Sequence, residues 1–285
     1  MADAFFFQRG RATILGVLNL TPDSFSDGGH FFGNGRVDVE AAVAAGLALV
    51  RDGADILDIG GESTRPGAPE VDEQEEIART AAVIEALAKA TPTPLSIDTR
   101  KSAVADAALA AGARIVNDVS GLRHDPDLAK VVARAQATLV LGHLRGEPAT
   151  MQADVTFEDC LREVGDELAE SVEVALRAGV LHERLVVDPG IGFGKGLGHN
   201  LTLLANVGVL RERLALPVLV GPSRKAFLGA LTGEPVAERD RATLAACAVA
   251  IFAGADGIRV HDVAGAARAA AVGLALRAAR REAAA

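Results

Sequence analysis

The sequence of 285 residues contains only two cysteines, Cys160 and Cys247. Both lie in stretches with a helical pattern, and their spacing fits neither a disulfide framework nor a metal-ligand motif. No grouping of His, Cys and Asp has the spacing of a tight transition-metal site. We therefore expect two buried thiols and a protein of the reducing cytoplasm.

Hydrophobic runs of membrane length and an excess of basic residues are also missing. No stretch approaches the run of about 20 uncharged apolar residues that a membrane helix needs. The apolar residues 4–7 precede Arg9 and Arg11 and are too few for a secretion signal. The formal net charge of −9 argues against a nucleic-acid or anionic-membrane partner. Any phosphate chemistry must therefore depend on a local cluster of basic residues.

What the sequence does have is a repeating pattern of short apolar runs. The runs that we expect to form strands are 13–19, 56–60, 95–100, 114–120, 137–143, 185–190, 217–223 and 257–262. Segments with charges at helical spacing separate most of them, such as 39–51, 73–89, 157–177, 201–213 and 239–252. Eight such units predict an α/β fold, a (β/α)8 TIM barrel, although a doubly wound open sheet has the same kind of units.

The chain shows no sign of a second domain. No Ser- or Pro-rich linker and no shift in composition interrupts it, so we expect a single domain over residues 1–285. Residues 4–12 are expected to form a short N-terminal strand or hairpin that closes the bottom of the barrel.

Polar side chains recur at the ends of the predicted strands. In chain order they are Asn19, residues 62–65, Asp98, Asn117, His143, Asp188, Ser223 with Lys225, and Arg259 with His261. The carboxyl ends of barrel strands meet at one rim, where active sites lie. Any one of these residues can also be a helix cap, and His143 fits a core position as well as a ligand contact. Their regular recurrence nevertheless indicates a site at this rim.

The kinds of side chain at this rim indicate a ligand with two different ends. Two carboxylates and an asparagine suit a ring with several N–H donors beside a carbonyl, such as the edge of a pterin or a guanine. Lys225, Arg259 and His261 follow the last two strands, where barrels commonly bind phosphate. We therefore expect a heterocycle at one end of the pocket and an anion at the other.

Three loops carry unusual numbers of glycine and polar residues. Loops 19–29 and 60–67 are candidate lids over the rim, or else ordinary solvated turns. The glycines that follow Asp188 do not give the G-x-G-x-x-G pattern, and Gly194-Lys195 lacks the Walker spacing. We therefore reject a nucleotide-binding motif in this third loop.

Several motifs resemble those of the dihydropteroate synthases, a family of pterin-binding TIM barrels. They are GVLNLTPDSFSDGG (16–29), DIGGESTRPGA (58–68), SIDTRKSAVADAAL (96–109), IVNDVSG (115–121), DPGIGFGK with HNL (188–201), VGPSRKAFLG (220–229) and GIRVHDV (257–263). The resemblance spans nearly the whole chain in the same order. The family usually has methionines where this chain has Gly142 and Leu144.

The resemblance implies a transferase of folate biosynthesis. It would condense 6-hydroxymethyl-7,8-dihydropterin diphosphate with 4-aminobenzoate, which gives 7,8-dihydropteroate and diphosphate. By the same resemblance, C–O cleavage to a pterin cation comes before attack by the amine. The resemblance also implies Mg²⁺ as cofactor and a homodimer that forms through helices far from the site.

The resemblance also assigns roles to individual residues. Pterin diphosphate would be bound by Thr64, Asp98, Asn117, Asp188, Lys225, Arg259 and His261. The 4-aminobenzoate site would involve Phe25, Thr64, Arg65, Pro66, Phe193 and Ser223, with Lys225 beside them. The catalytic residues would be Asp27, Lys225, Arg259 and His261, and Asn19 would be a ligand of Mg²⁺.

Two other functions fit parts of this pattern. A methyltetrahydrofolate-type pterin methyltransferase would share the pterin acids, but it needs neither the TPDSFSDGG loop nor the Ser-Arg-Lys segment. A catalytically silent pterin-binding homologue is expected to have lost some of Asn19, Arg65, Lys225 and His261, and all four are present. Both alternatives are therefore weaker than the synthase.

Overall fold

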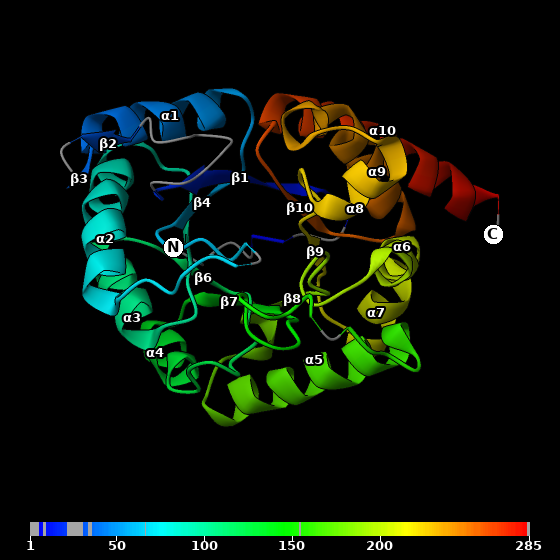
Figure 1. The fold of residues 1–285 in the computed structure, drawn as a ribbon, viewed down its shortest axis with the longest axis horizontal. Coiled ribbons are helices and arrows are strands. Elements are labelled where there is room, and N and C mark those ends of the chain that lie inside the picture. Colours follow the sequence, from blue (N-terminus) through cyan, green and yellow to red (C-terminus); the bar gives the residue numbers. More distant parts are fainter. Residues whose placement is uncertain are drawn as a thin grey trace.

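The computed structural model describes residues 6–7, 10–21, 31–33, 36–65, 67–153 and 155–283. A barrel of parallel strands occupies the centre, and a ring of helices surrounds it (Figure 1). The barrel strands are β1 (Thr13–Asn19), β4 (Ile56–Gly60), β5 (Leu95–Asp98), β6 (Ile115–Asp118), β7 (Thr138–Gly142), β8 (Leu185–Asp188), β9 (Leu219–Val220) and β10 (Gly257–Val260).

Pairing between the strands closes the barrel. The order is β8-β7-β6-β5-β4-β1-β10-β9, and a bridge from Val187 to Val218 joins the two ends. The predicted (β/α)8 barrel is therefore confirmed, and the open sheet is excluded. The strand expected over 217–223 shortens to Leu219–Val220 because Pro217 and Pro222 have no N–H group for a ladder.

The helices cover the outside of the barrel. They are α1 (Val39–Arg51), α2 (Glu73–Ala90), α3 (Ser102–Ala111), α4 (Leu128–Ala135), α5 (Cys160–Arg177), α6 (Leu197–Ala205), α7 (Val207–Leu214), α8 (Ala226–Thr232), α9 (Asp240–Ala253) and α10 (Val263–Glu282). Short 3₁₀ helices η1 (His182–Arg184) and η2 (Val236–Glu238) and the antiparallel strands β2 (Phe32–Gly33) and β3 (Arg36–Val37) lie in the connections.

The helix predicted over 201–213 is two helices, α6 and α7, which meet at Asn206. The side chain of Asn206 donates to the carbonyl of Thr202 at 2.8 Å, and its backbone leaves the helical region. This local hydrogen bond competes with the helical backbone pattern.

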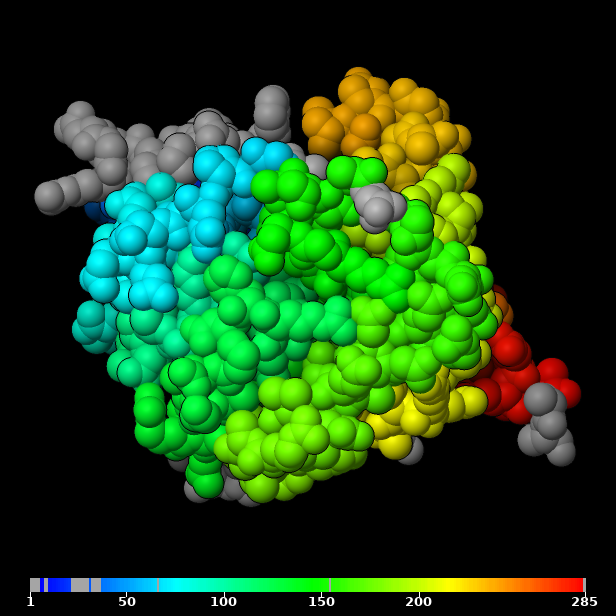
Figure 2. Space-filling model, turned by 60° about the horizontal axis from the view of Figure 1, so that its bottom comes forward, coloured from blue at the N-terminus to red at the C-terminus, as the bar shows by residue number. Residues whose placement is uncertain are grey.

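Figure 2 shows the side of the molecule that carries α5, with the C-terminal end of α10 projecting from the body. No helix in the described ranges is both long and apolar enough to cross a membrane.

The alternation of side chains along each strand creates the rim site. One layer of inward side chains is apolar and packs around Phe7: Leu15, Ile56, Ile115, Val140, Val186 and Leu219. Two residues further along, the same face of β4, β6 and β8 carries Asp58, Asn117 and Asp188. The barrel interior therefore changes from apolar at the bottom to polar at the carboxyl ends.

The bottom of the barrel is filled by Phe7, as predicted for this part of the chain. A Cβ atom at Gly257 would lie 2.8 Å from the Phe7 ring, so the glycine makes room for it. Of residues 4–12, the described ones are 6–7 and 10–12, and they form bends and a turn rather than a strand. The remaining residues lie outside the described part, so the hairpin stays a prediction.

Candidate active site

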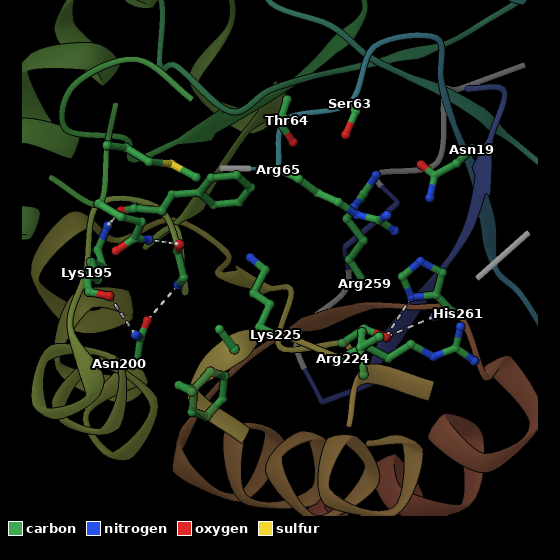
Figure 3. A pocket seen from close by; sticks show the side chains of 18 of the residues that line it. Asn19, Ser63, Thr64, Arg65, Lys195, Asn200, Arg224, Lys225, Arg259 and His261 are labelled. Carbon is green, nitrogen blue, oxygen red and sulfur yellow. Dashed lines mark hydrogen bonds between the residues drawn. The ribbon is translucent and has the colours of Figure 1, made fainter. Parts of the chain in front are cut away.

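A cavity of about 670 Å³ opens at the carboxyl ends of the barrel strands. A smaller cavity of about 50 Å³ shares much of its lining and lies against Asn117 and Asp188. The predicted site residues within the described ranges all line one or both: Asn19, Thr64, Arg65, Asp98, Asn117, Asp188, Phe193, Ser223, Lys225, Arg259 and His261. Figure 3 shows many of these side chains around one space, with Lys225 pointing into it. Phe25, Asp27 and Pro66 lie outside the described residues.

A charged network forms the floor of the site. Arg259 donates through Nε to Asp58 and through a terminal nitrogen to Asp98 at 2.6 Å. Asn117 Nδ2 also donates to Asp58, at 3.1 Å. Burial disfavours the charged guanidinium, but Asp58 and Asp98 outweigh this cost and raise the pKa of Arg259. Burial raises the pKa of Asp98 to about 7, although Arg259 opposes the shift.

Asp58 is a site residue that the sequence analysis missed. Its side chain is fully buried, and its Oδ1 atom has no hydrogen-bond partner among the described residues. The sequence feature that could have identified Asp58 is a single carboxylate within an otherwise apolar strand, ILDIG. Its spacing of two from Ile56 places it on the inward face of the strand. Burying such a group is costly unless it is paired, and Arg259 is its charged partner.

The loop that follows β8 brings Asp188, Lys225 and Phe193 together. Asp188 Oδ1 accepts from the backbone N–H of Gly190 at 2.7 Å. Lys225 donates to the Ile191 carbonyl, and its Nζ lies 4.1 Å from the centre of the Phe193 ring. Burial raises the pKa of Asp188 and lowers that of Lys225 to about 8, and the attraction between the two groups opposes both shifts. A cation and an aromatic face therefore border the same part of the cavity.

Ser223 and His261 form a hydrogen-bonded pair beside Arg259. Ser223 Oγ lies 2.8 Å from His261 Nδ1. Burial, together with the positive charges of Arg224 and Arg259, lowers the pKa of His261 to about 3, so the ring is neutral at pH 7. If Ser223 donates to Nδ1, the proton of the neutral ring is on Nε2. Nε2 is buried and has no partner within the described part of the chain, so it is placed to donate to a ligand.

The turn that contains Ser223 is anchored to α9. Arg224 has a φ of 55°, which is uncommon for a residue with a side chain. Its guanidinium donates to both carboxylate oxygens of Asp240, at 2.7 and 2.9 Å, and its N–H donates to Thr243 at 3.0 Å. These bonds fix the backbone between Ser223 and Lys225, and so help to place both side chains.

His143 is a core histidine, which was one of the two interpretations of its position. It is 2% exposed, and its Nε2 lies 3.1 Å from Glu167 while its Nδ1 lies 2.9 Å from Lys195 Nζ. Lys195 also donates to the carbonyl of Phe193 at 2.9 Å. Burial lowers the pKa of Lys195 to about 7 and that of His143 to about 4. Lys195 thus supports the wall of the site, a role that its place in a glycine-rich motif did not reveal.

Fold and site together define the class of the protein. A closed (β/α)8 barrel with a polar cavity at the carboxyl ends of its strands is the arrangement of a barrel enzyme that acts on a small molecule. The sequence pattern described as "Pterin binding enzyme" matches residues 15–261.

Named relatives narrow this class further. The chain is 45% identical over 259 residues to dihydropteroate synthase from Synechocystis sp., covering 90% of this chain and 88% of the relative. A Yersinia pestis dihydropteroate synthase structure with a sulfonamide drug complex has a TM-score of 0.88 and 39% identity, covering 94% of this chain and 95% of the other. The Xanthomonas albilineans enzyme in complex with 7,8-dihydropteroate has a TM-score of 0.81 and 42% identity, covering 94% of each chain. The chain therefore belongs to the pterin-binding enzyme family and, within it, to the dihydropteroate synthases, transferases of folate biosynthesis.

Proposed function

We propose that the chain condenses 6-hydroxymethyl-7,8-dihydropterin diphosphate with 4-aminobenzoate, which gives 7,8-dihydropteroate and diphosphate. The observation that carries this proposal is the cavity itself, which combines buried carboxylates and an amide with Lys225, Arg259 and His261. The similar Xanthomonas albilineans enzyme has been crystallised with 7,8-dihydropteroate, the product of this reaction.

The pterin ring binds among Asp98, Asn117 and Asp188. Asp188 Oδ1 is engaged by Gly190, so Oδ2 is left to accept from the amino and ring N–H groups of the pterin. The Asn117 amide group donates to Asp58, which fixes its orientation and leaves its oxygen as an acceptor. Three acceptors, on β5, β6 and β8, thus meet a ring edge that is rich in donors.

Arg259 exchanges partners when the substrate binds. Its guanidinium donates to Asp98, an acceptor that we assign to the pterin. Pterin N–H groups then donate to Asp98 in place of Arg259. The guanidinium nitrogen that this frees donates to the diphosphate of the same substrate. The hydrogen bond from Arg259 Nε to Asp58 is kept. One ligand thereby supplies both the replacement donor and the new anion. His261 Nε2 donates to the diphosphate as well.

Mg²⁺ fits this site as a cofactor held largely by the substrate. Asn19 lies on the cavity wall at the end of β1, and its amide oxygen is the kind of hard ligand that Mg²⁺ prefers. The described ranges hold no group of three or more His, Cys, Asp or Glu suited to a metal ion. Mg²⁺ often uses one or two protein oxygens and takes the rest from phosphates and water. When bound, it neutralises charge on the departing diphosphate.

The second substrate binds between the loops that follow β4 and β8. Thr64 and Arg65 come from the first loop, Phe193 from the second, and Ser223 with Lys225 from the turn after β9. C–O cleavage sends the bonding electrons to the departing diphosphate and leaves a resonance-stabilised pterin cation. The lone pair of the neutral 4-aminobenzoate amine then forms the C–N bond, and the resulting ammonium loses one proton to the diphosphate or to solvent. No side chain has to act as nucleophile. We assign stabilisation of this cation to Asp27, with Phe25 and Pro66 completing the benzoate site.

The assembly that we propose is a homodimer that uses α9 and α10. These two helices pack side by side. They carry three apolar side chains that are more than half exposed: Val249 at 52%, Val272 at 56% and Leu276 at 55%. A second copy of the chain would cover this face. Light scattering should give twice the chain mass, whereas a monomer at micromolar concentration would contradict the proposal.

For the compartment of the protein we propose the reducing cytoplasm, since Cys160 and Cys247 are buried free thiols.

Diphosphate release tests the proposed reaction. The protein is incubated with Mg²⁺ and pterin diphosphate, with and without 4-aminobenzoate, and both products are measured. Release together with dihydropteroate when both substrates are present is the expected result. Slow release without the benzoate would support cleavage before amine attack. Tight pterin binding with no release under either condition would identify a silent pterin-binding homologue instead.

A further inference from the structure

Four charged side chains are buried together next to the loop between β4 and α2, and one of them, Glu62, also lines the larger cavity. They are Glu62, Glu76, Arg100 and Lys101, with side-chain exposures of 4, 0, 5 and 5%. Lys101 Nζ lies 2.8 Å from Glu76 and 3.3 Å from Glu62, and Arg100 lies 3.4 Å from Glu62. Two positive and two negative groups therefore balance one another. We call these four residues the buried charge cluster.

The buried charge cluster ties together the two stems of the loop that contains Thr64 and Arg65. Glu62, on the first stem, accepts from the backbone N–H of Val71 on the second stem at 2.9 Å. Lys101 donates to the carbonyl of the same Val71 at 2.6 Å. The two ends of the loop are thereby joined to each other, to α2 through Glu76 and to the start of α3 through Lys101.

Packing at Gly61 strengthens this anchor. A Cβ atom there would lie 2.8 Å from Thr80 Cγ2 and 3.0 Å from Glu76 Cγ, so the backbone touches α2 directly. Arg79, from the same helix, donates to the Gly61 carbonyl at 2.9 Å. The first stem is therefore held by shape as well as by charge.

The buried charge cluster also reaches the loop that follows β7. Arg100 donates to Glu147 at 2.9 Å, and Met151 and Gln152 of the same loop line the larger cavity. Gln152 in turn donates to the carbonyl of Gly192, in the loop after β8, at 2.8 Å. A series of contacts thus connects three loops around the cavity.

Stability alone is a weak reason for such an arrangement. Taking four charged groups out of water is costly, and an apolar set of similar volume is often as stable. What an apolar set lacks is the directional hydrogen bonding to the N–H and C=O groups of Val71.

We propose that Glu62, Glu76 and Lys101 are positioning residues that hold Thr64 and Arg65 in place for the second substrate. This inference rests on the proposed placement of 4-aminobenzoate against that loop. Glu76 and Lys101 do not line the cavity, so their role requires no contact with a substrate. Of the residues assigned to pterin diphosphate, Thr64 alone belongs to this loop, so loss of the anchor should affect the benzoate far more than the pterin.

The test is a charge-balanced double variant, Lys101→Met with Glu76→Gln, which leaves Arg100 to neutralise Glu62. We expect KM for 4-aminobenzoate to rise about tenfold, because the loop that binds it loses its anchor. The Kd of pterin diphosphate should change by less than roughly threefold. Hydrogen exchange over residues 62–71 should accelerate, and exchange in the barrel strands should not.

The chain offers a matched control on the same helix. Lys89 and Glu85 form an exposed i,i+4 ion pair on α2, with exposures of 73 and 60%. Lys89→Met with Glu85→Gln removes the same charges away from the loop and should leave KM and hydrogen exchange unchanged. If the first double variant does not fold, Glu62→Gln serves instead and should raise KM about threefold.

The outcomes separate this inference from the proposed function. Arg65→Ala should raise KM for 4-aminobenzoate, and no change there would show that the benzoate does not bind at this loop. In that case, hydrogen exchange over residues 62–71 in the double variant would by itself show whether the buried charge cluster holds the loop. If Arg65→Ala raises KM while the Lys101 and Glu76 double variant changes neither KM nor exchange, the positioning role is refuted.

Discussion

The two loops that we place around the second substrate are held in different ways. The loop after β4 depends on the buried charge cluster, whose carboxylates and cations bind its stems. The loop after β8 depends on backbone shape. Its glycines at 190, 192 and 194 have φ angles of 66, 83 and 58°, and neighbouring atoms occupy the places of their missing Cβ atoms. Changes of charge should therefore disturb the first loop, and one added methyl group should disturb the second.

Gly190→Ala should have the largest effect. The new Cβ would lie 1.8 Å from the carbonyl oxygen of His143, and the backbone is already in the left-handed region. Steric overlap and strain together should cost about 3–5 kcal/mol and reduce kcat/KM by about a hundredfold or more. Thermal unfolding and steady-state kinetics measure both effects.

Gly198→Ala is the matched control for this substitution. Gly198 lies within α6, and no atom lies within 4 Å of the place its Cβ would take. Alanine there should stabilise the helix by up to about 1 kcal/mol and leave activity unchanged. Equal effects at 190 and 198 would contradict the view that shape holds the loop after β8.

Asn200→Ala should have the second-largest effect on stability and activity. The side chain accepts from Gly192 N–H at 2.6 Å and donates to the carbonyls of Lys195 and Gly196, at 3.1 and 2.8 Å. Its removal leaves buried backbone groups unpaired, at a cost of about 2–3 kcal/mol, and KM for 4-aminobenzoate should rise by about tenfold or more. Asn200→Asp keeps the acceptor but loses both donors, so it should not restore activity. An aspartate variant as active as the parent would show that these carbonyls need no partner.

Raising the pH should weaken the contact with substrate of Lys225, which comes from the turn after β9 and donates to Ile191 in the loop after β8. Burial lowers the pKa of Lys225 to about 8, so its charge is lost between pH 7 and 9. Both substrates are anions, and KM for 4-aminobenzoate should rise by up to about tenfold over this range. Above pH 8 the unfolded chain binds more protons at this lysine than the folded chain does, so its contribution to stability rises with pH. A flat KM, with circular dichroism showing an intact fold, would remove Lys225 from the benzoate site.

The sequence predicted the side chains at the rim of the barrel better than the buried charged groups that hold them in place. The position of Asp98, Asn117 and Asp188 at the ends of predicted barrel strands was enough to place them at one rim, and this gathering is observed. The pairing of Arg259 with Asp58 joins residues 201 positions apart and depends on closure of the barrel, which no local pattern encodes. The buried charge cluster has the same origin. Its members come from the loop after β4, from α2 and from the segment between β5 and α3, and they meet only in the folded chain.

Gly61→Ala should have the smallest effect, and it tests whether shape also matters in the first loop. The new Cβ would meet Thr80 Cγ2 at 2.8 Å, but the backbone of Gly61 is not left-handed, so strain does not add to the contact. We expect a loss of about 1–2 kcal/mol and a rise in KM of about threefold. Thr80→Ser in the same chain removes Cγ2 and keeps the hydroxyl bond to the Glu76 carbonyl, so it should restore most of the loss. Failure of this rescue would mean that charge alone, and not packing against α2, holds the loop after β4.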